Sequence, residues 1–118
     1  AKRYLANLTD EPHLTLPGFD DRNTQAWHLM VVRVGSDAPV SRNEVIAGLN
    51  ERGIGTSVHF IPLHLHTAFK DLGYWNEGDF PVAEQAFEGT VSLPLFPGIT
   101  DAEVDDVCQS LREILTGG

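Results

Sequence analysis

Three histidines are the side chains whose type and spacing are best suited to chemistry. His59, His64 and His66 fall within eight residues of one another. Imidazoles this close could bind zinc if a nearby carboxylate completed the coordination. The candidate carboxylates are Asp71, Glu77 and Asp79. However, the spacing matches no metal motif, and two of the histidines follow Pro62 rather than lying on the same element as His59. The alternative is that His59 is a hydrogen-bonded strand residue and that the other two are solvated.

The sequence contains no complete set of residues for a hydrolytic triad, a phosphate-binding loop or Schiff-base catalysis. Ser57 lies near His59, but no glycine-flanked serine or glycine-rich oxyanion loop accompanies the pair. The glycines complete no dinucleotide-binding or phosphate-binding motif. Lys2 and Lys70 are the only amines that could form a Schiff base, and both are expected to be solvated. The chain by itself therefore predicts no catalytic centre, no cofactor site and no metal site.

An apolar run surrounds the histidines in a segment that the sequence predicts to be a loop. Its members are Phe60, Ile61, Leu63 and Leu65. Apolar side chains on a loop indicate a docking surface. An acidic chain with such a loop resembles half of a site that something else completes.

Composition limits the classes of partner. The chain has 118 residues, a length that favours one domain over residues 1–118. Seventeen acidic and eight basic residues give a formal charge of -9, which would repel nucleic acid and anionic membranes. No apolar run is long enough to span a bilayer. Cys108 is the only cysteine, so an internal disulfide is excluded and a reducing, cytoplasmic location is expected. The absence of an initial methionine indicates a piece of a longer chain.

Two capping boxes predict the starts of the two clearest helices. Ser41 precedes Glu44 by three residues, which predicts a helix from Ser41 to about Arg52. Thr100 and Glu103 repeat the arrangement before the longest stretch of apolar residues at helical spacing. These signals place helices at both ends of the histidine region.

Three further helices have weaker signals. Residues 1–8 have apolar side chains at helical spacing, and residues 68–72 form a possible short helix. Pro81 suits the first position of a helix that continues to about residue 87, because the missing amide would be unpaired there anyway. Gly117 is placed to end the final helix.

Three segments are expected to be strands. Residues 27–34 are mostly apolar and β-branched, which predicts a strand covered on both faces or nearly so. Residues 55–60 and 90–93 are shorter, and each stops at a proline, Pro62 and Pro94. The expected fold is α+β, with a small, mostly antiparallel sheet of about three strands and helices packed mainly on one face.

Four segments stand in a particular order along the chain. They are residues 26–33 (AWHLMVVR), 52–64 (RGIGTSVHFIPLH), 78–84 (GDFPVAE) and 92–97 (SLPLFP). They are similar to successive blocks in the C-terminal part of the DegT/DnrJ/StrS sugar aminotransferases. The resemblance extends over about residues 5–115 and implies the small domain of a fold-type-I pyridoxal phosphate enzyme.

The resemblance also implies a reaction and its partners. Members of that family are homodimers that transfer an amino group, usually from glutamate, to a keto group of a nucleotide sugar. It implies that the aldimine-forming lysine, the acid at the pyridine nitrogen and the phosphate contacts belong to a large domain outside this chain. The chain alone is then expected to be inactive and to bind no pyridoxal phosphate.

Particular residues take on roles through the same resemblance. His59 and Phe60 match the segment that faces the substrate, and His64 belongs to the same block. Trp27 and residues 92–97 are expected to be architectural. Two alternatives remain open from the residues themselves: a self-sufficient binding module or metal protein built on the three histidines, and an interaction domain without a small-molecule site.

Overall fold

The computed structural model describes residues 1–18, 22 and 24–117. The helices and strands are, in chain order, α1 (Lys2–Leu8), β1 (Leu14–Thr15), β2 (Met30–Val34), α2 (Arg42–Glu51), the 3-10 turn η1 (Leu63–Leu65), α3 (Thr67–Lys70), α4 (Pro81–Gly89), β3 (Thr90–Leu93) and α5 (Asp101–Leu115). No helix in this described part is long and apolar enough to cross a membrane.

The described strands form one antiparallel sheet in the order β1-β2-β3. In the central pair Met30 lies opposite Leu93 and Arg33 lies opposite Thr90. The α+β prediction with a small antiparallel sheet is therefore confirmed, and the 90–93 strand has the predicted bounds. The short strand β1 was not predicted, because two residues carry no measurable alternation.

Two strand predictions were wrong in extent. The strand predicted at 27–34 begins at Met30. Trp27 has a φ of 47°, which an extended strand does not permit, and His28 lies in a bend. Residues 55–60 form no strand beyond an isolated bridge between Ser57 and Ser92. That segment turns away at Phe60, whose φ is 35°.

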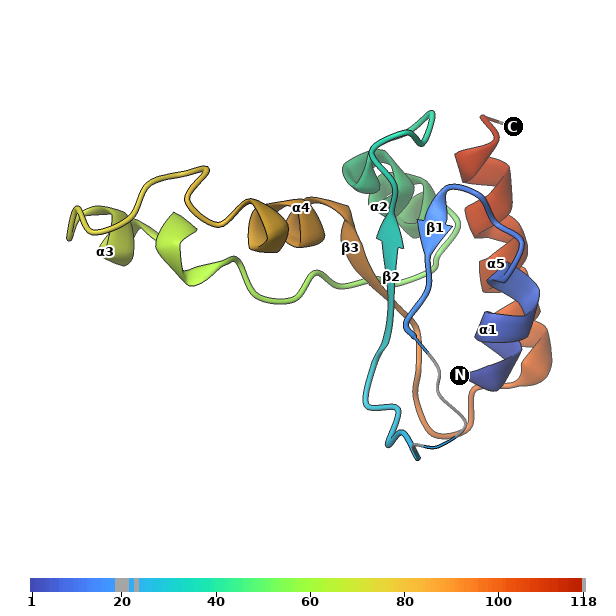
Figure 1. Ribbon diagram of the computed structural model, residues 1–118. Helices are drawn as coiled ribbons and strands as arrows, with labels where there is room; N and C mark the ends of the chain where they lie inside the picture. The colour runs from blue at the N-terminus through green and yellow to red at the C-terminus, as the bar shows by residue number, and fades with distance from the viewer. Residues whose placement is uncertain (19–21, 23, 118) are drawn as a thin grey trace.

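The hydrophobic core lies on one face of the sheet. In β2 the side chains of Met30, Val32 and Val34 are buried, whereas Val31 is half-buried and Arg33 is exposed. This alternation corrects the expectation of a strand covered on both faces. Helices α1, α2 and α5 cover the buried face (Figure 1). Their core residues are Tyr4, Leu8, Val45, Leu49, Val104, Val107, Cys108, Leu111 and Leu115.

Both predicted capping boxes are present. The Ser41 hydroxyl accepts from the Glu44 amide, and the Glu44 carboxylate accepts from the Ser41 amide at 2.7 Å. Thr100 and Glu103 make the same exchange, with 2.7 Å from the Thr100 amide to the carboxylate. These contacts satisfy backbone amides that a helix start leaves without partners. Helix α4 begins at Pro81, as the missing amide predicted.

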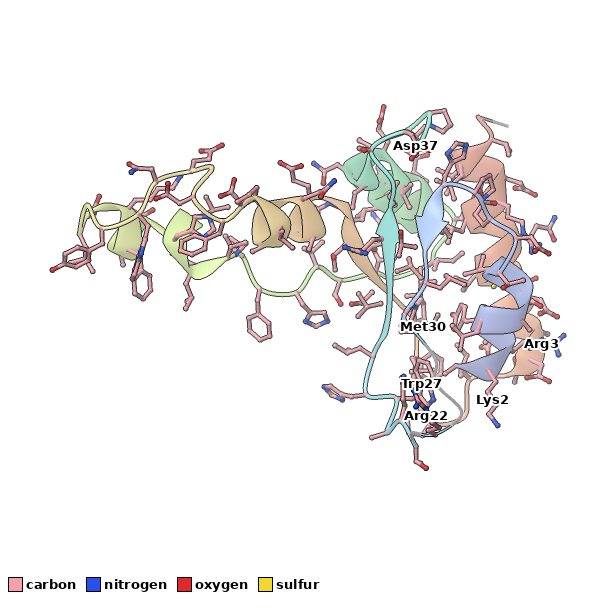
Figure 2. The ribbon with its side chains drawn as sticks, in the orientation of Figure 1. Lys2, Arg3, Arg22, Trp27, Met30 and Asp37 are labelled. Atoms are coloured by element: carbon pink, nitrogen blue, oxygen red, sulfur yellow. The ribbon has the colours of Figure 1, made fainter. Side chains whose placement is uncertain are left out.

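Polar contacts join α1 to α5 at the edge of the core. The Arg3 Nε donates to the Asp105 carboxylate at 2.7 Å, and the Asn7 side-chain Nδ2 donates to the same carboxylate at 2.7 Å. These two hydrogen bonds lower the pKa of Asp105, and the one from Arg3 has the larger effect. The Tyr4 hydroxyl donates to the Pro94 carbonyl at 2.9 Å and so connects α1 to the end of β3. Figure 2 shows Arg3 on the helix that lies along α5.

One segment extends away from this body. Residues 58–88, termed the arm, contain η1, α3 and most of α4, and they project to one side of the sheet (Figure 1). The molecule measures 49 × 37 × 24 Å, and its radius of gyration is 15.7 Å. A compact chain of this length would have a radius of gyration of roughly 13.5 Å. The arm therefore accounts for the elongated shape.

Candidate functional site

The candidate site begins where the chain leaves the sheet after the Ser57–Ser92 bridge. The Ser57 amide donates to the Ser92 carbonyl at 3.2 Å, and the Ser92 amide donates in return at 2.8 Å. His59, two residues later, is half-buried, and its Nε2 lies 3.4 Å from the Ser57 hydroxyl. The bridge to β3 thus sets the starting direction of the segment that carries His59.

Phe60 is the most exposed large apolar residue of the arm. Its side chain is 92% exposed, and its ring centroid lies 6.0 Å from that of His59. Its φ of 35° is unfavourable for a residue with a Cβ, at a cost of roughly 1–2 kcal/mol. Strained residues of this kind concentrate at binding sites. Phe60 therefore combines an open aromatic surface with a backbone conformation that points to function.

His64 is buried and contacts an acidic side chain. It is only 5% exposed, so the expectation of solvation was wrong. Its Nε2 lies 2.7 Å from a carboxylate oxygen of Glu84, and its ring centroid lies 4.8 Å from that of Phe80. The fold thus returns α4 to η1 across twenty residues.

The Glu84 carboxylate holds more than His64. It accepts hydrogen bonds from the Gly78 amide at 2.9 and 3.1 Å, one to each oxygen. The pKa of Glu84 is lowered, chiefly by the Gly78 amide and next by the His64 hydrogen bond. Glu84 is the last residue of the 78–84 segment that resembles the sugar aminotransferases, but no role was predicted for it from the sequence. An acid in the first turn of a helix that starts with proline was the available signal.

The three histidines do not converge. His59 contacts Ser57, His64 contacts Glu84, and the His66 Nε2 lies 3.2 Å from the Ile61 carbonyl oxygen. In the described ranges no group of three or more His, Cys, Asp or Glu side chains could hold a metal ion. The metal-binding alternative therefore has no support in the geometry.

A small cavity lies beside the bridge. Its volume is about 270 Å³, and its lining includes Leu29, Thr56, Ser57 and Ser92. The Ser92 side chain is 4% exposed, and its hydroxyl has no hydrogen-bond partner among the described residues. Ser92 was expected to be architectural, and the periodicity of the sequence gives no signal for a buried hydroxyl without a partner.

Further along, the arm carries a chain of aromatic contacts. Trp75 contacts three neighbouring rings, with centroid distances of 6.4 Å to Phe69, 6.0 Å to Tyr74 and 6.4 Å to Phe80. Of the ten large apolar side chains that the described residues leave exposed, all but Phe96 lie within residues 58–82. Exposed apolar side chains therefore extend beyond the Phe60 run over most of the arm, which is the segment predicted to carry a docking surface.

The two lysines lie on different helices. Lys2 lies exposed on α1 (Figure 2), and Lys70 is exposed at the end of α3 with its amine 3.9 Å from the Glu77 carboxylate.

Comparison with known proteins identifies relatives over nearly the whole chain. The model of the DegT/DnrJ/EryC1/StrS aminotransferase family matches residues 1–112. The spore coat polysaccharide biosynthesis protein SpsC of Bacillus subtilis (strain 168) is 44% identical over 120 residues, which cover 99% of this chain and 31% of SpsC.

Solved structures give the same result. The PLP form of Spr1654 from Streptococcus pneumoniae, a protein named as a sugar aminotransferase, matches with a TM-score of 0.87 and 28% identity over 98% of this chain and 29% of its own. S. venezuelae DesV in complex with a ketimine intermediate matches with a TM-score of 0.81 and 31% identity over 95% of this chain and 29% of its own.

These matches cover the sheet, the helices and the arm alike. The chain spans about 31% of the length of the curated relative SpsC. The four sequence blocks that resembled sugar aminotransferases all fall within the matched residues 1–112. The chain belongs to the DegT/DnrJ/EryC1/StrS aminotransferase family.

Proposed function

We propose that residues 1–118 are the C-terminal small domain of a pyridoxal-phosphate-dependent enzyme that transfers an amino group from glutamate to a keto nucleotide sugar. The observation that carries this proposal is the family match over residues 1–112 together with relatives about three times as long. The names of Spr1654 and SpsC support a sugar substrate and a place in polysaccharide biosynthesis.

The remainder of the longer polypeptide is the proposed partner of the arm. Nine large apolar side chains of residues 58–82 are exposed, and apolar side chains gathered on one segment are typical of an interaction site. A large domain that supplies the lysine, the acid and the phosphate contacts would cover some of these side chains. The intact enzyme would be a cytoplasmic homodimer, with 2-oxoglutarate as the product from the amino donor. Pyridoxal phosphate would supply the amino-transfer chemistry.

In this enzyme the present chain forms one wall of the substrate cavity. The His59 imidazole is polar, half-buried and beside an exposed aromatic ring, so it is suited to a hydrogen bond with a phosphate or sugar oxygen. Phe60 is suited to packing on the face of a sugar or a base. His64 is part of the same wall, where its bond to Glu84 fixes the segment that holds the other two.

Steady-state kinetics of the complete polypeptide would test these roles. His59→Asn and Phe60→Leu should each raise KM for the nucleotide sugar by about tenfold, which corresponds to the loss of one hydrogen bond or packing contact worth ~1.4 kcal/mol. The KM for glutamate should remain unchanged. His66→Asn is the matched control, because His66 is exposed and contacts only a carbonyl of its own segment.

The outcome separates the proposal from its rivals. A change in KM for the nucleotide sugar with His59→Asn but not with His66→Asn supports a wall of the substrate cavity. Equal effects of the two substitutions, or none, would contradict the assigned roles. A complete polypeptide that aminates no keto nucleotide sugar would contradict the proposed reaction itself.

A further inference from the structure

The contacts of Glu84 connect three segments of the arm. Within residues 58–88, all of which the structure describes, His64 is the only buried residue. Its Nε2 and the Gly78 amide share one Glu84 oxygen, at 2.7 and 2.9 Å. The Phe80 ring lies beside His64, with 4.8 Å between the ring centroids. We refer to Glu84, His64, Gly78 and Phe80 as the Glu84 cluster.

We propose that Glu84 is a positioning residue that fixes the His59–Phe60 segment relative to the sheet. The effect on substrate rests on the function proposed above, whereas the effect on the arm's conformation does not. Glu84 itself would not contact the substrate, because its carboxylate is occupied by His64 and Gly78.

The route from the sheet to the site runs through α4. Helix α4 continues into β3 without a connecting loop and packs on β2, so its position is set by the sheet. Glu84 lies in the first turn of this helix and reaches His64 in η1. His64 is four residues after Phe60, separated from it by Ile61, Pro62 and Leu63. The buried hydrogen bond between His64 and Glu84 therefore connects the segment that carries His59 and Phe60 to the helix that the sheet holds in place.

Few other contacts could take over this task. Nearly every residue from 66 to 83 is exposed, so the distal arm has little apolar packing of its own apart from its ring contacts. Gly78 has a φ of 94°, a conformation that residues with a Cβ rarely adopt, and its amide is held only by Glu84. Segments with few buried contacts open readily. Removing the Glu84 carboxylate should therefore release both the loop that contains Gly78 and the turn η1 that contains His64.

The tautomer of His64 offers a separate signature. A carboxylate accepts and does not donate, so a neutral His64 must carry its proton on Nε2. The nitrogen shifts of a ¹⁵N-labelled His64 ring report that proton position directly. The Nε2–H form should be present in the wild type and in Glu84→Gln, whose remaining carbonyl oxygen can still accept. Glu84→Ala removes the acceptor, and the fixed tautomer should be lost.

The test uses the complete polypeptide with Glu84→Ala, with Glu84→Gln as the conservative variant and with Glu88→Ala as the control on the same helix. Glu88 is exposed, and its side chain makes no hydrogen bond or ion pair with another described residue. Hydrogen exchange at the Gly78 amide should accelerate at least about tenfold in Glu84→Ala and stay near the wild-type rate in the other two, because local protection follows the opening equilibrium. The KM for the nucleotide sugar should rise in Glu84→Ala while the KM for glutamate stays constant.

The possible results decide separate points. Unchanged Gly78 exchange in Glu84→Ala, or equal acceleration in Glu88→Ala, would overturn the positioning role. Faster exchange with an unchanged KM would overturn it too, provided that His59→Asn raises that KM. If neither His59→Asn nor Glu84→Ala changes KM while Gly78 exchange accelerates, the proposed substrate wall fails and the conformational role of Glu84 stands.

Discussion

Gly89 is the residue at which a single added methyl group should disturb the joint between arm and sheet most. It is the last residue of α4 and is buried against β2. A Cβ built at Gly89 would lie 2.5 Å from the Val34 carbonyl oxygen and 3.5 Å from the Val34 amide nitrogen. Both atoms belong to the backbone and cannot rotate away. Gly89→Ala must therefore separate α4 from β2 by at least about half an ångström.

The expected cost follows from two opposing effects. Overpacking a well-packed contact costs typically ~1–3 kcal/mol. Alanine is favoured over glycine in helices by up to about 1 kcal/mol, and this gain offsets part of the cost. The net prediction is a loss of about 1–2 kcal/mol, or a decrease in Tm of roughly 4 °C for each kcal/mol in a chain of this size.

Chemical denaturation and hydrogen exchange would measure the change. Gly55→Ala is the matched control, because its Cβ would meet nothing within 4 Å and its φ is not positive. Gly48→Ala is an intermediate case, because its nearest neighbour at 2.9 Å is the end of the flexible Ile114 side chain. The expected order of destabilisation is Gly89→Ala above Gly48→Ala above Gly55→Ala. A Gly89→Ala variant as stable as the wild type would refute the reasoning.

Three further substitutions test other parts of the structure. Ser92→Ala should leave stability unchanged or raise it by up to ~1 kcal/mol, because it removes a buried hydroxyl without a partner, and a clear loss on denaturation would contradict this. Thr100→Ala should cost about 1 kcal/mol through loss of the α5 cap, with the exposed Thr9→Ala as a control that changes little. Because the folded pKa of Asp105 is lowered, its contribution is present above the unfolded pKa and is lost as the pH falls below about 4; Asp105→Asn should flatten the acid side of the stability profile.

Local signals predicted the parts of the fold that depend on neighbouring residues. The capping boxes at Ser41 and Thr100, the proline start of α4 and the bounds of β3 all follow from interactions within a few residues. The resemblance to sugar aminotransferases was also confirmed, since the family match spans residues 1–112.

Features that depend on long-range contacts could not be predicted in the same way. The strand predicted at 55–60 is reduced to the Ser57–Ser92 bridge, and the segment turns away at Phe60 through a positive φ that no apolar pattern encodes. The burial of His64 depends on Glu84, twenty residues away in sequence. The roles of His59, Phe60 and His64 toward a substrate stay predictions. Phe60 is exposed and so accessible to a ligand, whereas His64 is buried and so suited to hold the segment in place.

Photocrosslinking in the complete polypeptide would test most directly whether this chain forms a wall of the substrate cavity. The photoreactive residue p-benzoylphenylalanine would replace either Phe60 or Leu72, two exposed apolar positions on the arm. Irradiation with a radiolabelled nucleotide sugar should label the protein modified at position 60, and excess unlabelled nucleotide sugar should suppress that labelling. Labelling at position 72 should be near background. Equal labelling at the two positions, or none at position 60, would contradict the account.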